Sequence, residues 1–184
     1  PIPFRRIAVN IQQGFTLPVI TIGIATFICL KIKPKYGMVV TFLLVIAVFA
    51  FALAGIWASG KSNPMLLNGL IPIVDAEMYY DDAFRIINGG KISTLASGYK
   101  PIFTVYLAST LILSGYNLQI SIAVMTFVAA LGCFFATIAF NKKFGPLPAT
   151  LFFLLIFLFT RVYIGNTSSE MLGIPIGLLG FSLL

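Results

Sequence analysis

The chain has 184 residues, of which 59% are hydrophobic and only 9% are charged, and its mean hydropathy is +1.03. Soluble domains carry roughly 25% charged residues, so the composition predicts an integral membrane protein. Histidine is absent, and Cys29 and Cys133 both lie in apolar runs, which excludes metal sites built on these residue types and a disulfide framework. The net charge of +7 comes from Lys and Arg at the ends of apolar runs, where they are typical of membrane anchors. No basic stripe interleaved with aromatic residues indicates a nucleic-acid partner.

The first half of the chain predicts one clear transmembrane helix. A spanning helix needs ~20 apolar residues, and the run 38–58 is long enough. The run 14–30 is shorter and interrupted by a proline and a glycine, so we expect a short or re-entrant helix there. Positively charged linkers stay in the cytoplasm, which places the three lysines before 38–58 on that side: Lys31, Lys33 and Lys35. The segment 59–100 should then be an outer loop that faces the periplasm or its luminal equivalent.

The second half predicts further membrane helices over 101–140, a transmembrane helix over 147–165 and the start of another over 171–184. Lys142 and Lys143 should again be cytoplasmic. This alternation requires that 101–116, which is short, does not cross the membrane. If it does cross, either the lysine pair lies outside or another run fails to span.

Together these runs predict an all-α fold, a polytopic transmembrane helical bundle formed by a single membrane module over 1–184. The sequence begins without a methionine and stops inside an apolar run. We therefore expect the N-terminal part of a longer protein, integral to a bacterial or archaeal cell membrane, with its acidic loop facing outward.

Four of the five acidic residues crowd into the outer loop: Asp75, Glu77, Asp81 and Asp82. Apolar residues recur there with helical spacing opposite these acids, which predicts an amphipathic helix over 76–88 lying in the membrane plane. Asn88-Gly89-Gly90 should end it. We expect Arg85 to pair with Asp81 or to be shared with Asp82, as part of a solvated face. Asp75, at the membrane boundary, is expected to cap the helix, a role compatible with a second one.

The stretches "DAEMYYDDAFRIINGG" and "GYKPIFTVYL" resemble the first outer loop of the GT-C glycosyltransferases, which are polytopic enzymes that use polyprenyl-phosphate-linked sugars. The matching residues are Asp75, Tyr79, Ala83 and Gly89, followed by Lys100-Pro101. The Lys-Pro version is most similar to aminoarabinose transferases and relatives of protein O-mannosyltransferases. Further on, "NKKFGPLPATLFFLLIFLFTRVYIGNTSSEML" resembles the family's basic-Phe-Gly turn and the arginine and Ser-Glu of its next outer loop. The chain departs from the pattern at Ala76, where many members carry a second acid, and at Ile102, which replaces a second proline.

The resemblance implies roles for five residues. Asp75 would be the catalytic carboxylate that orients or deprotonates the acceptor. Lys100 and Arg161 would contact the donor phosphate and offset its developing charge. Glu170 would orient the acceptor or support a metal, and Tyr79 would contact the donor. The alternative for Lys100 is a membrane anchor and for Tyr79 an interfacial aromatic residue.

The resemblance also leaves open a divalent cation, Mg²⁺ or Mn²⁺, for which Asp75 and Glu170 are the available ligands. The expected partners are the lipid bilayer and a polyprenyl-phosphate sugar, with no nucleic acid. A second hypothesis is a non-catalytic membrane subunit of a larger complex, which would have other membrane subunits as partners. A transporter is disfavoured, because no acid or cation lies at the centre of a predicted span.

Overall fold

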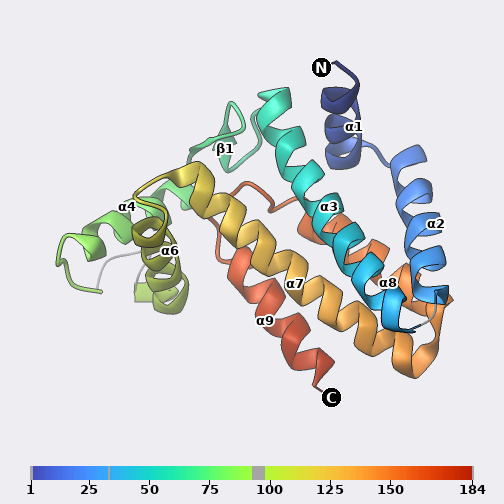
Figure 1. Cartoon of the computed structure of the whole chain (residues 1–184). Coiled ribbons are helices and arrows are strands. Elements are labelled where there is room, and N and C mark those ends of the chain that lie inside the picture. The colour runs from blue at the N-terminus through green and yellow to red at the C-terminus, as the bar shows by residue number, and fades with distance from the viewer. Residues whose placement is uncertain (1, 33, 93–97, 184) are drawn as a thin grey trace.

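The computed structural model describes residues 2–32, 34–92 and 98–183 (Figure 1). It is 77% helical, which confirms the predicted helical class. A small antiparallel hairpin, which the sequence did not predict, pairs β1 (Leu66–Leu67) with β2 (Ile71–Pro72). The described helices are α1 (Ile2–Gln13), α2 (Leu17–Lys31), α3 (Pro34–Ser59), α4 (Asp75–Ile87), α6 (Pro101–Leu113), α7 (Leu118–Phe144), α8 (Pro146–Thr160) and α9 (Glu170–Ser182).

Two described helices are long and apolar enough to cross a membrane, over Tyr36–Ser59 of α3 and Leu118–Phe144 of α7. Helices α1 and α2 meet at 89°, so that this pair is either a broken third span or a re-entrant unit. The apolar helices α6, α8 and α9 have 13, 15 and 13 residues, fewer than the ~20 that a crossing needs. The helix expected over 147–165 in fact ends at Thr160, and the chain continues as a loop to α9.

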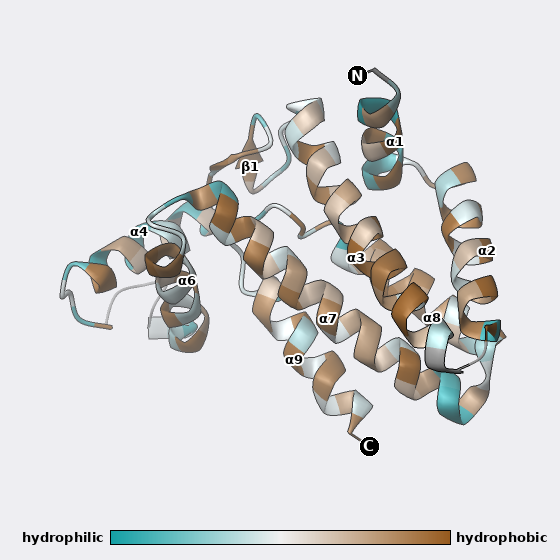
Figure 2. Ribbon diagram, in the orientation of Figure 1, coloured by the Kyte–Doolittle hydropathy of each residue, from teal (hydrophilic) through white to brown (hydrophobic). Residues whose placement is uncertain are grey.

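The helices share two ends that differ in charge. In Figure 1, α7 and α9 run side by side from the same end, and α4 and the start of α6 lie at that end, which we call the acidic end. The opposite end carries the last turns of α2 and α7, with Lys31, Lys142 and Lys143, and we call it the lysine end. Figure 2 shows hydrophilic residues at α1, at α4 and around the turn from α7 to α8, with apolar residues between.

Helix α6 stays at the acidic end. Lys100, which precedes it, lies beside Ser169 at the start of α9. Its last residue, Leu113, is followed after a short turn by α7. Both α7 and α9 begin at the acidic end, so α6 starts and ends there and does not run to the lysine end. This agrees with the expectation that 101–116 does not cross the membrane, which follows from placing both lysine groups on one side.

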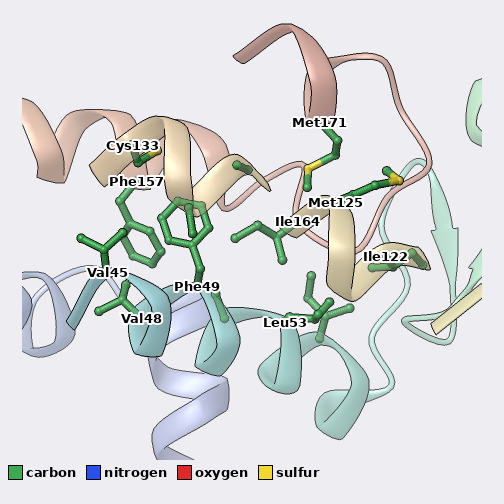
Figure 3. Packing of buried hydrophobic residues seen from close by; sticks show 14 of the residues in the cluster. Val45, Val48, Phe49, Leu53, Ile122, Met125, Cys133, Phe157, Ile164 and Met171 are labelled. Carbon is green, nitrogen blue, oxygen red and sulfur yellow. The ribbon is translucent and has the colours of Figure 1, made fainter. Parts of the chain in front are cut away.

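The core lies where α3, α7, α8 and α9 meet (Figure 3). Phe49 of α3 and Phe157 of α8 are fully buried, and their rings meet edge to face with centroids 5.5 Å apart. Gly132 lets α7 approach α9 closely, because a Cβ there would lie 2.7 Å from the Cα of Pro175. Many large apolar side chains point outward and stay exposed, as contact with lipid requires.

Helix α4 confirms the predicted amphipathic helix, one residue earlier than expected. Ala83 is buried and Glu77 and Asp81 are exposed. The prediction that Asp75 caps the helix is wrong, because Asp75 is its first residue and Val74 occupies the N-cap position without a side-chain hydrogen bond.

Helix α4 also carries an ion pair, but not on its solvated face. Asp82 is only 8% exposed, so the prediction that it belongs to that face is wrong. Arg85 is paired with Asp82, with 3.1 Å between Nη2 and Oδ1. Next to it, burial raises the pKa of the Tyr80 phenol, and the charge of Asp81 raises that pKa further.

Candidate functional site

The start of α6 brings a lysine to the start of α9. Lys100 takes the N-cap position of α6, and Pro101 supplies the first helical residue, where its missing N–H costs nothing. The Nζ atom of Lys100 donates a hydrogen bond to Oγ of Ser169 at 2.6 Å. Ser169 is the N-cap residue of α9, so two helix N-termini and one ammonium group meet at this point.

Tyr79 completes one side of this cluster. Its ring lies below the lysine, with Nζ of Lys100 5.8 Å from the ring centroid. The same ring packs edge to face on Phe103, at 5.2 Å between centroids. Phe103 is buried, so the contact fixes the position of Tyr79 beside the lysine. The structure therefore joins two of the residues singled out in the sequence, Lys100 and Tyr79.

Lys100 also lines an open groove of about 310 Å³ between the first turns of α6 and α9. Apart from Lys100 and Ser169, most of its walls are apolar side chains, among them Ile102, Leu172 and Ile176. Ile102 is 74% exposed, so the groove opens onto an apolar surface. The positive ends of two helix dipoles beside an ammonium group favour an anion at this position, and the apolar walls favour a hydrocarbon chain.

Glu170 belongs to the same cluster through Ser169. The Ser169 hydroxyl donates toward Oε2 of Glu170 at 3.4 Å, and Glu170 is half-buried as the first residue of α9. The Ser169 hydroxyl can thus accept a hydrogen bond from the ammonium group and donate one to the carboxylate. Glu170 does not line the groove itself.

Asp75 belongs to the same helix as Tyr79 but does not line the groove. It is exposed, one helical turn before Tyr79. The start of α4 is tied to the loop before α9 by a buried hydrogen bond, from the hydroxyl of Thr167 to the carbonyl of Ala76 at 2.7 Å. Asp75 is therefore exposed at a helix start whose buried side is tied to that loop.

Arg161 has a different environment from Lys100. It is only 4% exposed, and its Nη1 atom donates to the carbonyl oxygens of Ile11 at 3.1 Å and Gly14 at 2.7 Å. Its guanidinium stacks on the ring of Phe15, and its own carbonyl accepts a hydrogen bond from Gln12. These contacts bind Arg161 to the bend between α1 and α2, and none joins it to Lys100. The structure thus separates the two cations that the resemblance groups around one phosphate.

Within the described residues, no three His, Cys, Asp or Glu side chains are grouped so that they could hold a metal ion. The divalent cation, for which Asp75 and Glu170 are the available ligands, stays a prediction.

Two features of the site escaped the sequence analysis. Ser169 is the direct partner of Lys100, and its only signal was its place before an isolated acid at a helix start. Residues 164–168 of the loop before α9 are also unexpectedly buried. Asn166 begins the sequence Asn-Thr-Ser, which matches the N-glycosylation pattern, but it is 3% exposed, so the folded chain does not present it to a modifying enzyme.

Comparison of the chain with protein-family models, with curated proteins and with solved structures finds no match.

Proposed function

We propose that this chain forms the membrane module of a GT-C-type glycosyltransferase, which transfers a sugar from a polyprenyl-phosphate donor to an acceptor at the acidic end. The observation that carries the proposal is the position of Lys100. Its ammonium group lies where the first turns of two helices meet, at the edge of a groove with apolar walls. This combination fits a ligand with a phosphate head and a hydrocarbon tail.

The groove supports the choice of donor. A polyprenyl phosphate is an anion attached to a long apolar chain, and the chain needs a path into lipid. The open groove supplies that path past Ile102 and Ile176, both of which are exposed. The phosphate would meet Lys100, whose charge would stabilise the leaving group as the bond to the sugar breaks.

Asp75 and Glu170 supply the carboxylates of the proposed reaction. Asp75 is exposed at the rim, where an acceptor from outside the membrane can reach it. As a general base it would take the proton of the acceptor hydroxyl as the oxygen attacks the anomeric carbon. Glu170, held next to Ser169, would orient the acceptor.

The proposal includes a polytopic bundle whose acidic end faces outward. Lys31, Lys142 and Lys143 at the lysine end support this orientation, because all five acids belong to α4 and to the first turn of α9, toward the other end. That other end also carries cations, among them Lys61, Arg85 and Lys100, so the support comes from the lack of acids at the lysine end. Positive residues are retained on the cytoplasmic side.

The test is a transfer assay on the membrane protein with polyprenyl-phosphate sugars and a mixture of acceptors. Asp75→Asn should lower the rate by roughly 10²–10⁴-fold, the usual effect of losing a general base. Asp81→Asn is the matched control, since it removes an exposed acid from the same helix, and its rate should equal that of wild type. Equal transfer by wild type and Asp75→Asn would remove Asp75 from the mechanism.

A second candidate is a non-catalytic membrane subunit. Two observations favour it: Asp75 does not line the groove, and Ala76 stands where relatives of the GT-C type carry a second acid. In the same assay this candidate predicts no transfer by wild type or by either variant, while the lipid phosphate still binds.

A further inference from the structure

A second cavity lies at the lysine end, between α2, α3 and α7. Its volume is about 150 Å³, about ten times the roughly 10–15 Å³ that one water needs. Leu30, Met38 and Ile138 contribute apolar walls, and Asn141 and Lys142 contribute the polar side chains. The cavity is thus part polar and part apolar, at a depth where the helices end.

The positive charge around this cavity has no carboxylate to pair with. Lys31 follows Leu30 in the last turn of α2, and Lys143 follows Lys142 in the last turn of α7. All five acidic residues of the chain lie at 75–82 and 170. Helix α7 has 27 residues, so its two ends are about 40 Å apart. An anion from outside the chain is therefore the available counter-charge.

Asn141 adds a hydrogen-bonding requirement. Its Oδ1 atom is buried and has no hydrogen-bond partner in the structure. A buried acceptor of this kind loses its hydrogen bond to water without replacement, which is unfavourable. A ligand that brings a hydroxyl donor into the cavity would satisfy it.

We propose that this cavity binds the headgroup of an anionic glycerophospholipid that carries a hydroxyl group, with Lys142 holding the phosphate and Asn141 accepting the hydroxyl hydrogen. The acyl chains lie along the exposed apolar surface beside Met38, which is 49% exposed. Basic pockets between transmembrane helices are suited to such headgroups. The site is separate from the groove at Lys100 and does not depend on sugar transfer.

The test is native mass spectrometry of the purified protein in detergent, with phosphatidylglycerol added and phosphatidylcholine as the neutral reference. Wild type should retain phosphatidylglycerol preferentially. Lys142→Gln should weaken its binding about fivefold, the effect of one lysine near an anionic lipid surface. Lys143→Gln is the matched control, since it removes the same charge one residue away from the cavity wall and should change binding much less. Lys142→Arg, which keeps the positive charge, should retain the binding of phosphatidylglycerol.

A further variant and a competitor test the chemistry of the headgroup. Asn141→Ala should abolish the preference for phosphatidylglycerol over phosphatidic acid, which lacks the glycerol hydroxyls. Soluble glycerol 3-phosphate should not displace the lipid. Equal losses in Lys142→Gln and Lys143→Gln would overturn the proposal, as would equal binding of the charged and neutral lipids. Displacement by glycerol 3-phosphate would show that the site serves a soluble phosphate and would overturn it too.

Discussion

Two regions of the acidic end each contain a cation that the sequence singled out, and the two cations have opposite environments. At the start of α6, Lys100 is exposed, makes one hydrogen bond to Ser169 and lines an open groove. After α8, Arg161 is buried and donates two hydrogen bonds to backbone carbonyls at the bend between α1 and α2. The sequence motif around each residue suggested the same partner, a phosphate.

The difference shows how a buried cation can be fully occupied inside the protein. Ile11 and Gly14 lie at the C-terminal end of α1, where helix carbonyls have no partner within the helix. Arg161 satisfies two such carbonyls and is stabilised by the negative end of that helix dipole. Lys100 lies instead at helix N-termini, where the dipoles repel a cation and attract an anion. The first arrangement stabilises the fold, and the second is suited to a ligand.

The largest effect that separates the two regions should come from Arg161→Leu. It leaves two backbone carbonyls unpaired, and hydrogen bonds to charged groups are worth ~1.5–3 kcal/mol each. We expect the free energy of unfolding in detergent micelles, measured by equilibrium denaturation, to fall by about 3 kcal/mol. Lys100→Leu, the matched variant, should change it little because Lys100 is exposed. Similar losses in both variants would contradict the distinction between them.

Gly55→Ala should have the next largest effect. A Cβ at Gly55 would lie 2.3 Å from the carbonyl oxygen of Ala8, so α1 would have to move away from α3. Overpacking of this kind costs about 1–3 kcal/mol, and protease cleavage within α1 should become faster. Gly177→Ala is the control, because a Cβ there meets nothing within 4 Å. Unchanged stability in Gly55→Ala would mean that α1 is not packed closely against α3.

Val74→Gly should have the smallest effect, and it concerns the region near Lys100. Val74 has φ of 56°, a conformation that a β-branched residue adopts only under strain. Glycine relieves strain of about 1–3 kcal/mol, against an entropic loss of roughly 0.5–1 kcal/mol. Thermal unfolding should therefore show equal or slightly higher stability. The comparison is Val105→Gly inside α6, which should lower stability. If both variants are equally destabilised, the start of α4 is not strained.

The sequence predicted most helices correctly because their signals are local. Apolar runs located α3 and α7, and helical spacing located α4 with its buried Ala83 and its exposed Glu77 and Asp81, although Asp82 is buried. Of the lysines expected on one side, Lys31, Lys142 and Lys143 lie at one shared end of the helices. The exact start of α4 was less predictable. The backbone at Val74 takes an unusual conformation, and Asp75 becomes the first helical residue.

The site was less predictable than the helices, because it depends on contacts between distant segments. Nothing local to Ser169 indicates that it lies beside Lys100, 69 positions away. The role of Arg161 depends equally on a bend about 150 residues earlier in the chain. An arginine after an apolar run is compatible with a ligand or with an internal acceptor, and only the packing of α1 and α2 decides between them.

The most direct test of the central claim is the binding of a short-chain polyprenyl phosphate to the protein in detergent. The account predicts that Lys100→Met weakens binding about tenfold or more, the loss of one charge-assisted hydrogen bond. Lys61→Met, which removes an exposed lysine at the same end, should bind like wild type. Equal affinity of wild type and Lys100→Met would contradict the assignment of the groove to a lipid phosphate.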